Sequence, residues 1–96
     1  MTRVRWTDPS LADLRRIDDW LTNEASPAFA IRSLTTIRFR STLLVDFPHA
    51  GRPYRGNIRL LRVLDTPYII HYRIVDGGVV QVLRVYEERE DWQTAI

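Results

Sequence analysis

Two periods of hydrophobic and polar residues follow one another along the chain, and they predict helices first and strands afterwards. Apolar side chains initially recur every three or four residues, which predicts an amphipathic helix that ends near Asn23. These positions are Leu11, Leu14, Ile17, Trp20 and Leu21. The segment before them begins the helix, because Thr7 or Asp8 can cap free amides and Pro9 needs no donor. Ser26-Pro27 repeats this start signal, so a second helix should form an antiparallel hairpin with the first.

The second helix, predicted to end near Phe47-Pro48, carries two apolar stripes. The stronger stripe includes Ala30, Leu34, Ile37, Leu44 and Val45. The weaker stripe consists of Phe29, Thr36, Leu43 and Phe47, with Phe39 at its border. In one interpretation, one stripe packs on the first helix and the other on a sheet. In the alternative, part of the weaker stripe is a surface for another protein.

The rest of the chain alternates with a period of two. Arg3 to Trp6 predicts a short strand, and residues 48–57, with two Pro and two Gly, predict a loop. Three strand-like runs follow, separated by the turns 65–67 and 76–78: Ile58 to Leu64, Tyr68 to Val75 and Val79 to Tyr86. The order β-α-α-β-β-β indicates an α+β fold, in which an N-terminal helical hairpin packs on one face of an antiparallel sheet. At 96 residues, the chain is expected to be a single domain, 1–96.

The period of two also assigns side chains to the two faces of the sheet. Tyr68, Ile70, Tyr72 and Ile74 should face the helices. If Gly77 and Gly78 form a two-residue turn, Val79, Gln81, Leu83 and Val85 join them, and the opposite face carries His71, Arg73, Arg84 and Tyr86. A three-residue turn would exchange this pairing. Arg59 or Arg62 would join the second face, depending on the register of the preceding strand.

The composition excludes several kinds of functional site. The chain has no Cys, which excludes disulfides and thiolate chemistry, and His49 and His71 lack the spacing of a metal site, so no metal or other cofactor is expected. No apolar run approaches the roughly 20 residues of a membrane helix, and no signal peptide is visible, so we expect a cytoplasmic protein. All 14 basic residues are Arg. Guanidinium groups suit phosphates or the carboxylates of a partner protein, although codon bias in a GC-rich genome is the better explanation for the absence of Lys itself.

Several short motifs occur in one order along nearly the whole chain. They are Trp6-Thr7, Asp13-Leu14 with Ile17, Pro48-x-x-Gly51-Arg52, Arg62-Val63, Pro67-Tyr68 with Tyr72-Arg73-Ile74, Leu83-Arg84-Val85 and Asp91-Trp92. In this order they resemble the RelE/ParE toxin superfamily, and the ParE branch more closely. The fold of that family has the element order predicted above.

The resemblance implies the toxin of a bacterial type II toxin–antitoxin pair, neutralised by a ParD-like antitoxin. The ParE branch implies growth arrest through inhibition of DNA gyrase by binding, without an enzymatic activity. The alternatives are a RelE-like, ribosome-dependent mRNA endoribonuclease and a degenerate toxin that acts only in the operon-repressing complex. In this family the antitoxin binds DNA, so direct DNA binding by this chain is not expected, and neither is a membrane partner.

The resemblance and the strand pattern together suggest site residues. The target-binding candidates are Arg59, Arg62, Arg73, Arg84, Glu87, Arg89 and Trp92, where Trp92 is either a packing anchor or part of the target surface. The antitoxin-binding candidates are Leu14, Ile17, Leu43 and Phe47 for apolar side chains, and Arg73 and Arg84 for acidic ones. The endoribonuclease alternative would use Arg73, Arg84, Tyr86 and His71. Glu87 and Glu90 stand where the ParE branch often has His and Arg, which departs from the family pattern.

Overall fold

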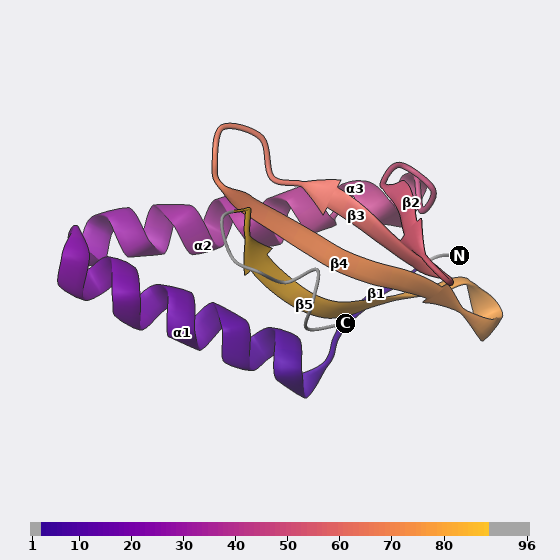
Figure 1. Cartoon of the computed structure of the whole chain (residues 1–96), viewed down its shortest axis with the longest axis horizontal. Helices are drawn as coiled ribbons and strands as arrows, with labels where there is room; N and C mark the ends of the chain where they lie inside the picture. The colour runs from indigo at the N-terminus through magenta and orange to yellow at the C-terminus, as the bar shows by residue number, and fades with distance from the viewer. Residues whose placement is uncertain (1–2, 89–96) are drawn as a thin grey trace.

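A five-stranded sheet with a helical hairpin on one face forms the described part of the chain, residues 3–88 of the computed structural model (Figure 1). The elements are β1 (Arg3–Trp6), α1 (Asp8–Glu24), α2 (Pro27–Ser41), α3 (Leu43–Asp46), β2 (Arg52–Arg55), β3 (Ile58–Arg62), β4 (Tyr68–Val75) and β5 (Val79–Glu87). The strand order is β1-β5-β4-β3-β2. The predicted α+β class and the helical hairpin are therefore confirmed.

The helices begin at the predicted caps. The Thr7 hydroxyl accepts a hydrogen bond from the amide of Ser10 at 3.3 Å, and the Ser26 hydroxyl accepts one from the amide of Phe29 at 3.1 Å. The prediction of one long second helix was wrong, because α2 ends at Ser41 and α3 follows as a separate turn. The amide and the hydroxyl of Thr42 both donate to the Phe39 carbonyl, which tightens the last turn and ends the regular helix.

Two features of the sheet differ from the prediction. Residues 52–55, expected in a loop, form the edge strand β2 and pair with β3 across a turn at Gly56, whose φ of +56° suits glycine. The sheet is also not purely antiparallel, because β1 pairs in parallel with β5, from Arg3 opposite Val79 to Trp6 opposite Val82. Sequence alternation predicts a strand but does not specify which distant strand it joins.

The β4–β5 register combines a three-residue turn with a bulge. Val75 lies opposite Val79, and Tyr72 lies opposite Val82, yet His71 lies opposite Arg84, so Leu83 is an extra residue in β5. Of the two turns that the sequence left open, the three-residue turn forms. The residues of β5 that face the helices are therefore Val80, Val82 and Val85, and not Val79, Gln81 and Leu83, which a two-residue turn would have placed there. Beyond the bulge, Val85 faces the helices, and Arg84 and Tyr86 lie on the opposite face, as a two-residue turn would also have placed them.

The main core lies between the sheet and the helical hairpin. Leu14, Ile17 and Leu21 of α1 and Ala30 and Ile37 of α2 are buried against the sheet. Their sheet neighbours are Leu61, Val63, Tyr68, Ile70, Tyr72, Val80, Val82 and Val85. The predicted Tyr-Ile face of β4 is thus the face that the helices cover. None of the helices in residues 3–88 combines the length and the apolar character needed to cross a membrane.

Candidate functional site

The sheet face opposite the helices carries arginines from all five strands, because Arg3 and Arg5 of β1 lie opposite Val79 and Gln81 of β5. We call the part formed by the arginines of β2 to β5 the cationic face: Arg52, Arg62, Arg73 and Arg84. Arg52, Leu60, His71 and Arg84 form one row across β2, β3, β4 and β5, since each lies directly opposite the next. Arg62, Ile69 and Tyr86 form a second row. Arg73 lies opposite Gln81, and its Nε donates to the Gln81 Oε1 at 2.7 Å.

Aromatic side chains also lie on this face. The His71 ring meets the ring of Tyr86 edge-on with centroids 4.7 Å apart, and that of Tyr54 with centroids 6.1 Å apart. His71 is 1% exposed, and Tyr86 is also buried. Burial, followed by the positive charge of Arg84, lowers the pKa of His71 to about 4. The His71 ring is therefore neutral near pH 7. The side chains of His71 and Tyr86 are both buried.

Arg84 is held from the helical side of the molecule. Its Nε and Nη2 donate to the Asp13 carboxylate of α1 at 2.7 and 2.9 Å. Its guanidinium carbon also lies 4.8 Å from the centroid of the Tyr86 ring. The side chain remains 41% exposed, so the cation is both fixed and accessible.

The structure brings three of the seven predicted target-binding residues together. Arg62, Arg73 and Arg84 share the cationic face, and Arg62 pairs with Glu88 at 2.6 Å. Arg59 does not join them, because it lies opposite Tyr72 on the helical face, where its Nε and Nη2 donate to the carbonyls of Gly51 and His49. Glu87 lies opposite Tyr68, away from the cationic face. Arg89 and Trp92 lie outside the described residues.

The predicted apolar antitoxin-binding residues differ in how deeply they are buried. Leu14 and Ile17 are buried in the core and form only the floor of hollows at the surface. Leu43 is half-buried and Phe47 is exposed, and both line a hollow of about 450 Å³ beside the 48–50 loop. The exposed phenylalanines of the weaker stripe favour the interpretation of that stripe as a protein surface.

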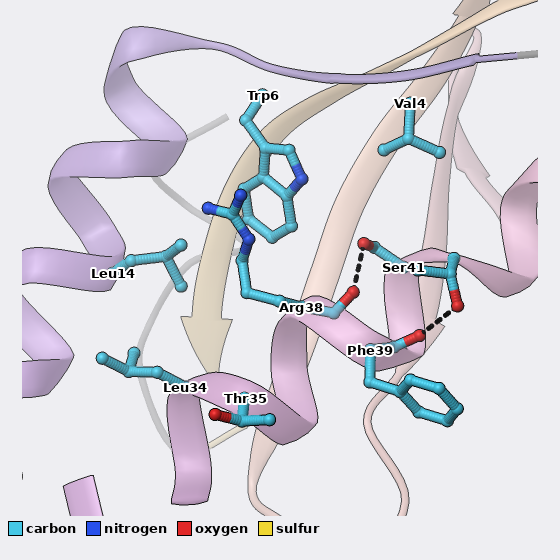
Figure 2. Close-up of a pocket in the computed structure, with 9 residues that line it drawn as sticks. Val4, Trp6, Leu14, Leu34, Thr35, Arg38, Phe39 and Ser41 are labelled. Carbon is cyan, nitrogen blue, oxygen red and sulfur yellow. Dashed lines mark hydrogen bonds between the residues drawn. The ribbon is translucent and has the colours of Figure 1, made fainter. Parts of the chain in front are cut away.

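An apolar groove lies between β1 and α2, and we call it the β1–α2 groove (Figure 2). It has a volume of about 660 Å³ and is lined by Val4, Trp6, Leu14, Leu34, Thr35, Arg38, Phe39, Ser41 and Thr42. Figure 2 shows the Arg38 guanidinium against the Trp6 indole, with its carbon 4.9 Å from the ring centroid. Phe39 stands at the rim and is 76% exposed. The groove thus combines an apolar lining with a cation at its wall.

Sequence reasoning missed several residues of these surfaces. Arg52 was assigned to a loop, although the Gly56-Asn57 pair is a hairpin signal that could have revealed β2. Asp13 is not among the predicted site residues, although it stands four residues before Ile17, on the apolar stripe. No sequence signal joins Trp6 to Arg38, because their contact depends on how β1 and α2 pack.

The arrangement offers cations and apolar hollows, and it concentrates no metal ligands. Within residues 3–88, no cluster of three or more His, Asp or Glu side chains has a geometry that could hold a metal ion. The accessible chemistry of the cationic face is that of guanidinium groups, which bind phosphates and carboxylates with two parallel hydrogen bonds.

Comparisons with known proteins identify the family of this chain. Residues 4–92 match the family model described as the ParE toxin of the type II toxin–antitoxin system parDE. Toxin RelE2 of Caulobacter vibrioides is 34% identical over 85 residues, which cover 88% of this chain and 93% of that protein. A structure of the chromosomal ParDE system from P. aeruginosa superposes with a TM-score of 0.83 at 28% identity, covering 91% of this chain and 96% of that one.

More distant structures share the fold. The toxin–antitoxin complex RelBE2 from Mycobacterium tuberculosis superposes with a TM-score of 0.65 at 24% identity, covering 88% of this chain and 95% of that chain. A mutant of the E. coli toxin RelE in the free state gives a TM-score of 0.66 at 13% identity, covering 97% of this chain and 90% of that chain. The family match spans both the cationic face and the β1–α2 groove, and the chain therefore belongs to the ParE toxin family of type II toxin–antitoxin systems.

Proposed function

We propose that this toxin arrests growth by binding DNA gyrase through its cationic face, and that a ParD-like antitoxin neutralises it. One observation carries the proposal. The arginines of the face are exposed or half-exposed, whereas the groups that could transfer a proton, His71 and Tyr86, are buried. A surface of this kind binds a partner but does not expose a general acid or base to it.

The same observation argues against mRNA cleavage. Arginine stabilises phosphate charge but is a poor general base near neutral pH, because its pKa exceeds about 12. A nuclease would then depend on His71 or Tyr86. Burial and Arg84 lower the pKa of His71 to about 4, and the Tyr86 ring lies under the Arg84 guanidinium. Either residue could act on RNA only after the face had opened.

The antitoxin is proposed to occupy the β1–α2 groove. The groove can take apolar side chains against Val4, Trp6 and Leu34, and Arg38 stands at its wall to pair with an acidic residue. The edge of β1 lies beside it, and an extended segment can add to such an edge through main-chain hydrogen bonds. The structural neighbours in ParDE and RelBE2 systems support an antitoxin as the partner.

The target is tested with purified proteins and variants of the face. Arg73→Ala and Arg84→Ala should weaken growth arrest and the inhibition of gyrase supercoiling, whereas Arg15→Ala, an exposed arginine of α1, should change neither. Circular dichroism confirms that each variant is folded. Because Arg84→Ala removes the closer of the two arginines that pair with Asp13, Arg73→Ala decides the test if Arg84→Ala does not fold. Unchanged growth arrest by a folded Arg73→Ala would refute the role of the face.

An in vitro translation assay, run beside the supercoiling assay, separates the two candidate targets. Inhibition of translation with cuts in the mRNA, and no effect on supercoiling, would overturn the gyrase proposal in favour of the endoribonuclease. If the wild-type toxin arrests neither reaction nor growth, the chain is a degenerate toxin.

A second variant tests where the antitoxin binds. Phe39→Asp replaces the exposed rim of the β1–α2 groove with a carboxylate and should reduce binding of the antitoxin encoded in the neighbouring reading frame. The matched control is Ile31→Asp, which changes another exposed apolar residue of α2 that does not line the groove. Equal loss of binding in both variants would show that the antitoxin covers α2 without entering the groove.

A further inference from the structure

A buried carboxylate links the helical hairpin to the cationic face. The side chain of Asp13, in α1, is 5% exposed. It accepts hydrogen bonds from Arg84 Nε at 2.7 Å, from Arg84 Nη2 at 2.9 Å and from the amide of Val85 at 2.9 Å. Arg16 Nη2 approaches it at 3.5 Å from the exposed side of α1. A carboxylate so deeply buried needs this full set of donors, because losing one leaves charge unpaired.

The position of Asp13 follows from the end of β1. That strand pairs with β5 only as far as Val82. The chain then turns into α1, and Thr7 holds the next carbonyls of β5, those of Val82 and Leu83, through its hydroxyl at 2.8 and 3.2 Å. Asp13, one and a half turns further along the helix, takes the amide of Val85. The first half of α1 thus continues the sheet edge where β1 stops.

Asp13 also determines the orientation of Arg84. Two hydrogen bonds to one carboxylate define the plane of the guanidinium group, and the Tyr86 ring supports that group at 4.8 Å. An arginine on a free surface loses side-chain entropy when it binds a partner, whereas Arg84 has already lost it on folding. The exposed part of Arg84 is therefore presented in one orientation.

We propose that Asp13 is a positioning residue of the toxin: it does not contact the target, but it orients Arg84 on the cationic face and couples that face to α1. This inference rests on the proposed role of the cationic face as the target surface. It adds a residue of α1 at the edge of the sheet, from an element that also lines the β1–α2 groove through Leu14.

The decisive variant is Asp13→Asn. It keeps the shape of the side chain and an oxygen for the Val85 amide, but it removes the charge that holds Arg84. Growth arrest, measured at equal levels of folded toxin, should fall about tenfold, which is the expected loss for one charge-assisted interaction of about 1.4 kcal/mol. Asp19→Asn, an exposed carboxylate on the same helix, is the matched control and should leave growth arrest unchanged.

The rate at which the Arg84 Nε–H exchanges with solvent separates a positioning role of Asp13 from a role in stability alone. In ¹⁵N-labelled wild-type toxin the Arg84 Nε–H should exchange slowly with solvent, because Asp13 accepts it. Asp13→Asn should make that exchange fast while backbone amides of the core stay protected. If Asp13→Asn does not fold, Asp13→Glu takes its place in both measurements, because it keeps the charge but displaces the guanidinium by one methylene.

A double-mutant cycle completes the test. In an Arg84→Gln background, Asp13→Asn should cause no further loss of growth arrest, since its effect passes through Arg84. A folded Asp13→Asn variant with fast Nε–H exchange and full growth arrest would overturn the proposal and leave Asp13 a structural residue. An equal loss in both backgrounds would overturn it as well.

The same data distinguish this inference from the proposed function. Growth arrest reports any target, so a toxin that arrests growth without inhibiting gyrase would refute gyrase as the target and leave the role of Asp13 open to the cycle. A toxin that does not arrest growth would refute the proposed function, and the Nε–H exchange would then decide whether Asp13 orients Arg84.

Discussion

Replacing His71 with phenylalanine should change how the stability of this toxin depends on pH. Phenylalanine keeps a ring between Tyr54 and Tyr86 but cannot take up a proton. In the folded chain, burial and the charge of Arg84 lower the pKa of His71 from 6.5 to about 4. The unfolded chain therefore binds a proton at this residue below pH 6.5, and the folded chain does so only below about pH 4.

The sign and size of the effect follow from that difference. The stabilising effect of a neutral His71 is fully present above pH 6.5 and is lost as the pH falls toward 4, because protons bind the unfolded chain preferentially. The full loss is about 3 kcal/mol, on the scale of 1.4 kcal/mol per pKa unit. This is a large part of the 5–15 kcal/mol by which a typical domain is stable.

The measurement is urea unfolding of the wild type and of His71→Phe at half-unit steps from pH 8 to pH 4. The difference in free energy of unfolding between the two proteins isolates His71, because the carboxylates titrate in both. It should be constant above pH 6.5 and should then shift in favour of the variant as the pH falls. Parallel curves over the whole range would refute the conclusion that His71 is held neutral by burial.

Three further changes test the loop and the caps. Gly51→Ala places a Cβ 2.7 Å from the carbonyl oxygen of Leu60, so urea unfolding should show a loss of about 1–3 kcal/mol, and an unchanged midpoint would contradict the close packing of this loop. Tyr72→Phe removes the hydroxyl that donates to the Pro48 carbonyl and accepts from the Gly51 amide, and it should cost about 1–3 kcal/mol in the same assay; a loss within error would mean that water replaces both bonds. Ser26→Ala removes the cap of α2 and should cost about 1 kcal/mol, measured as a lower thermal midpoint, whereas a stability equal to that of the wild type would show that the cap is redundant.

Local signals predicted much of the fold. The caps at Thr7 and Ser26 act within three residues of the helix starts they specify, and the bounds of β4 follow from a run of β-branched and aromatic residues. The prediction was wrong where a distant partner decides the structure. Arg52 to Arg55 form a strand because β3 is beside them, and the bulge at Leu83 depends on the pairing of β4 with β5.

The candidate site shows the same division. Alternation placed His71, Arg73, Arg84 and Tyr86 on one face, and the structure agrees. The alternation pattern could not choose between Arg59 and Arg62, because that choice needs the register of β3 against β4.

The sequence by itself determined the order of the elements apart from α3 and β2, the apolar face of β4 and an arginine-only set of cations, because helix periods, strand periods and caps are local properties of the chain. The tertiary structure alone decided which arginines become a surface. It directs Arg59 toward the 49–51 loop and adds Arg52 to the cationic face through β2. It also pairs Arg84 with a carboxylate 71 residues away. Such contacts depend on strand register and on the packing of a helix against a sheet edge, and no local pattern encodes either of them.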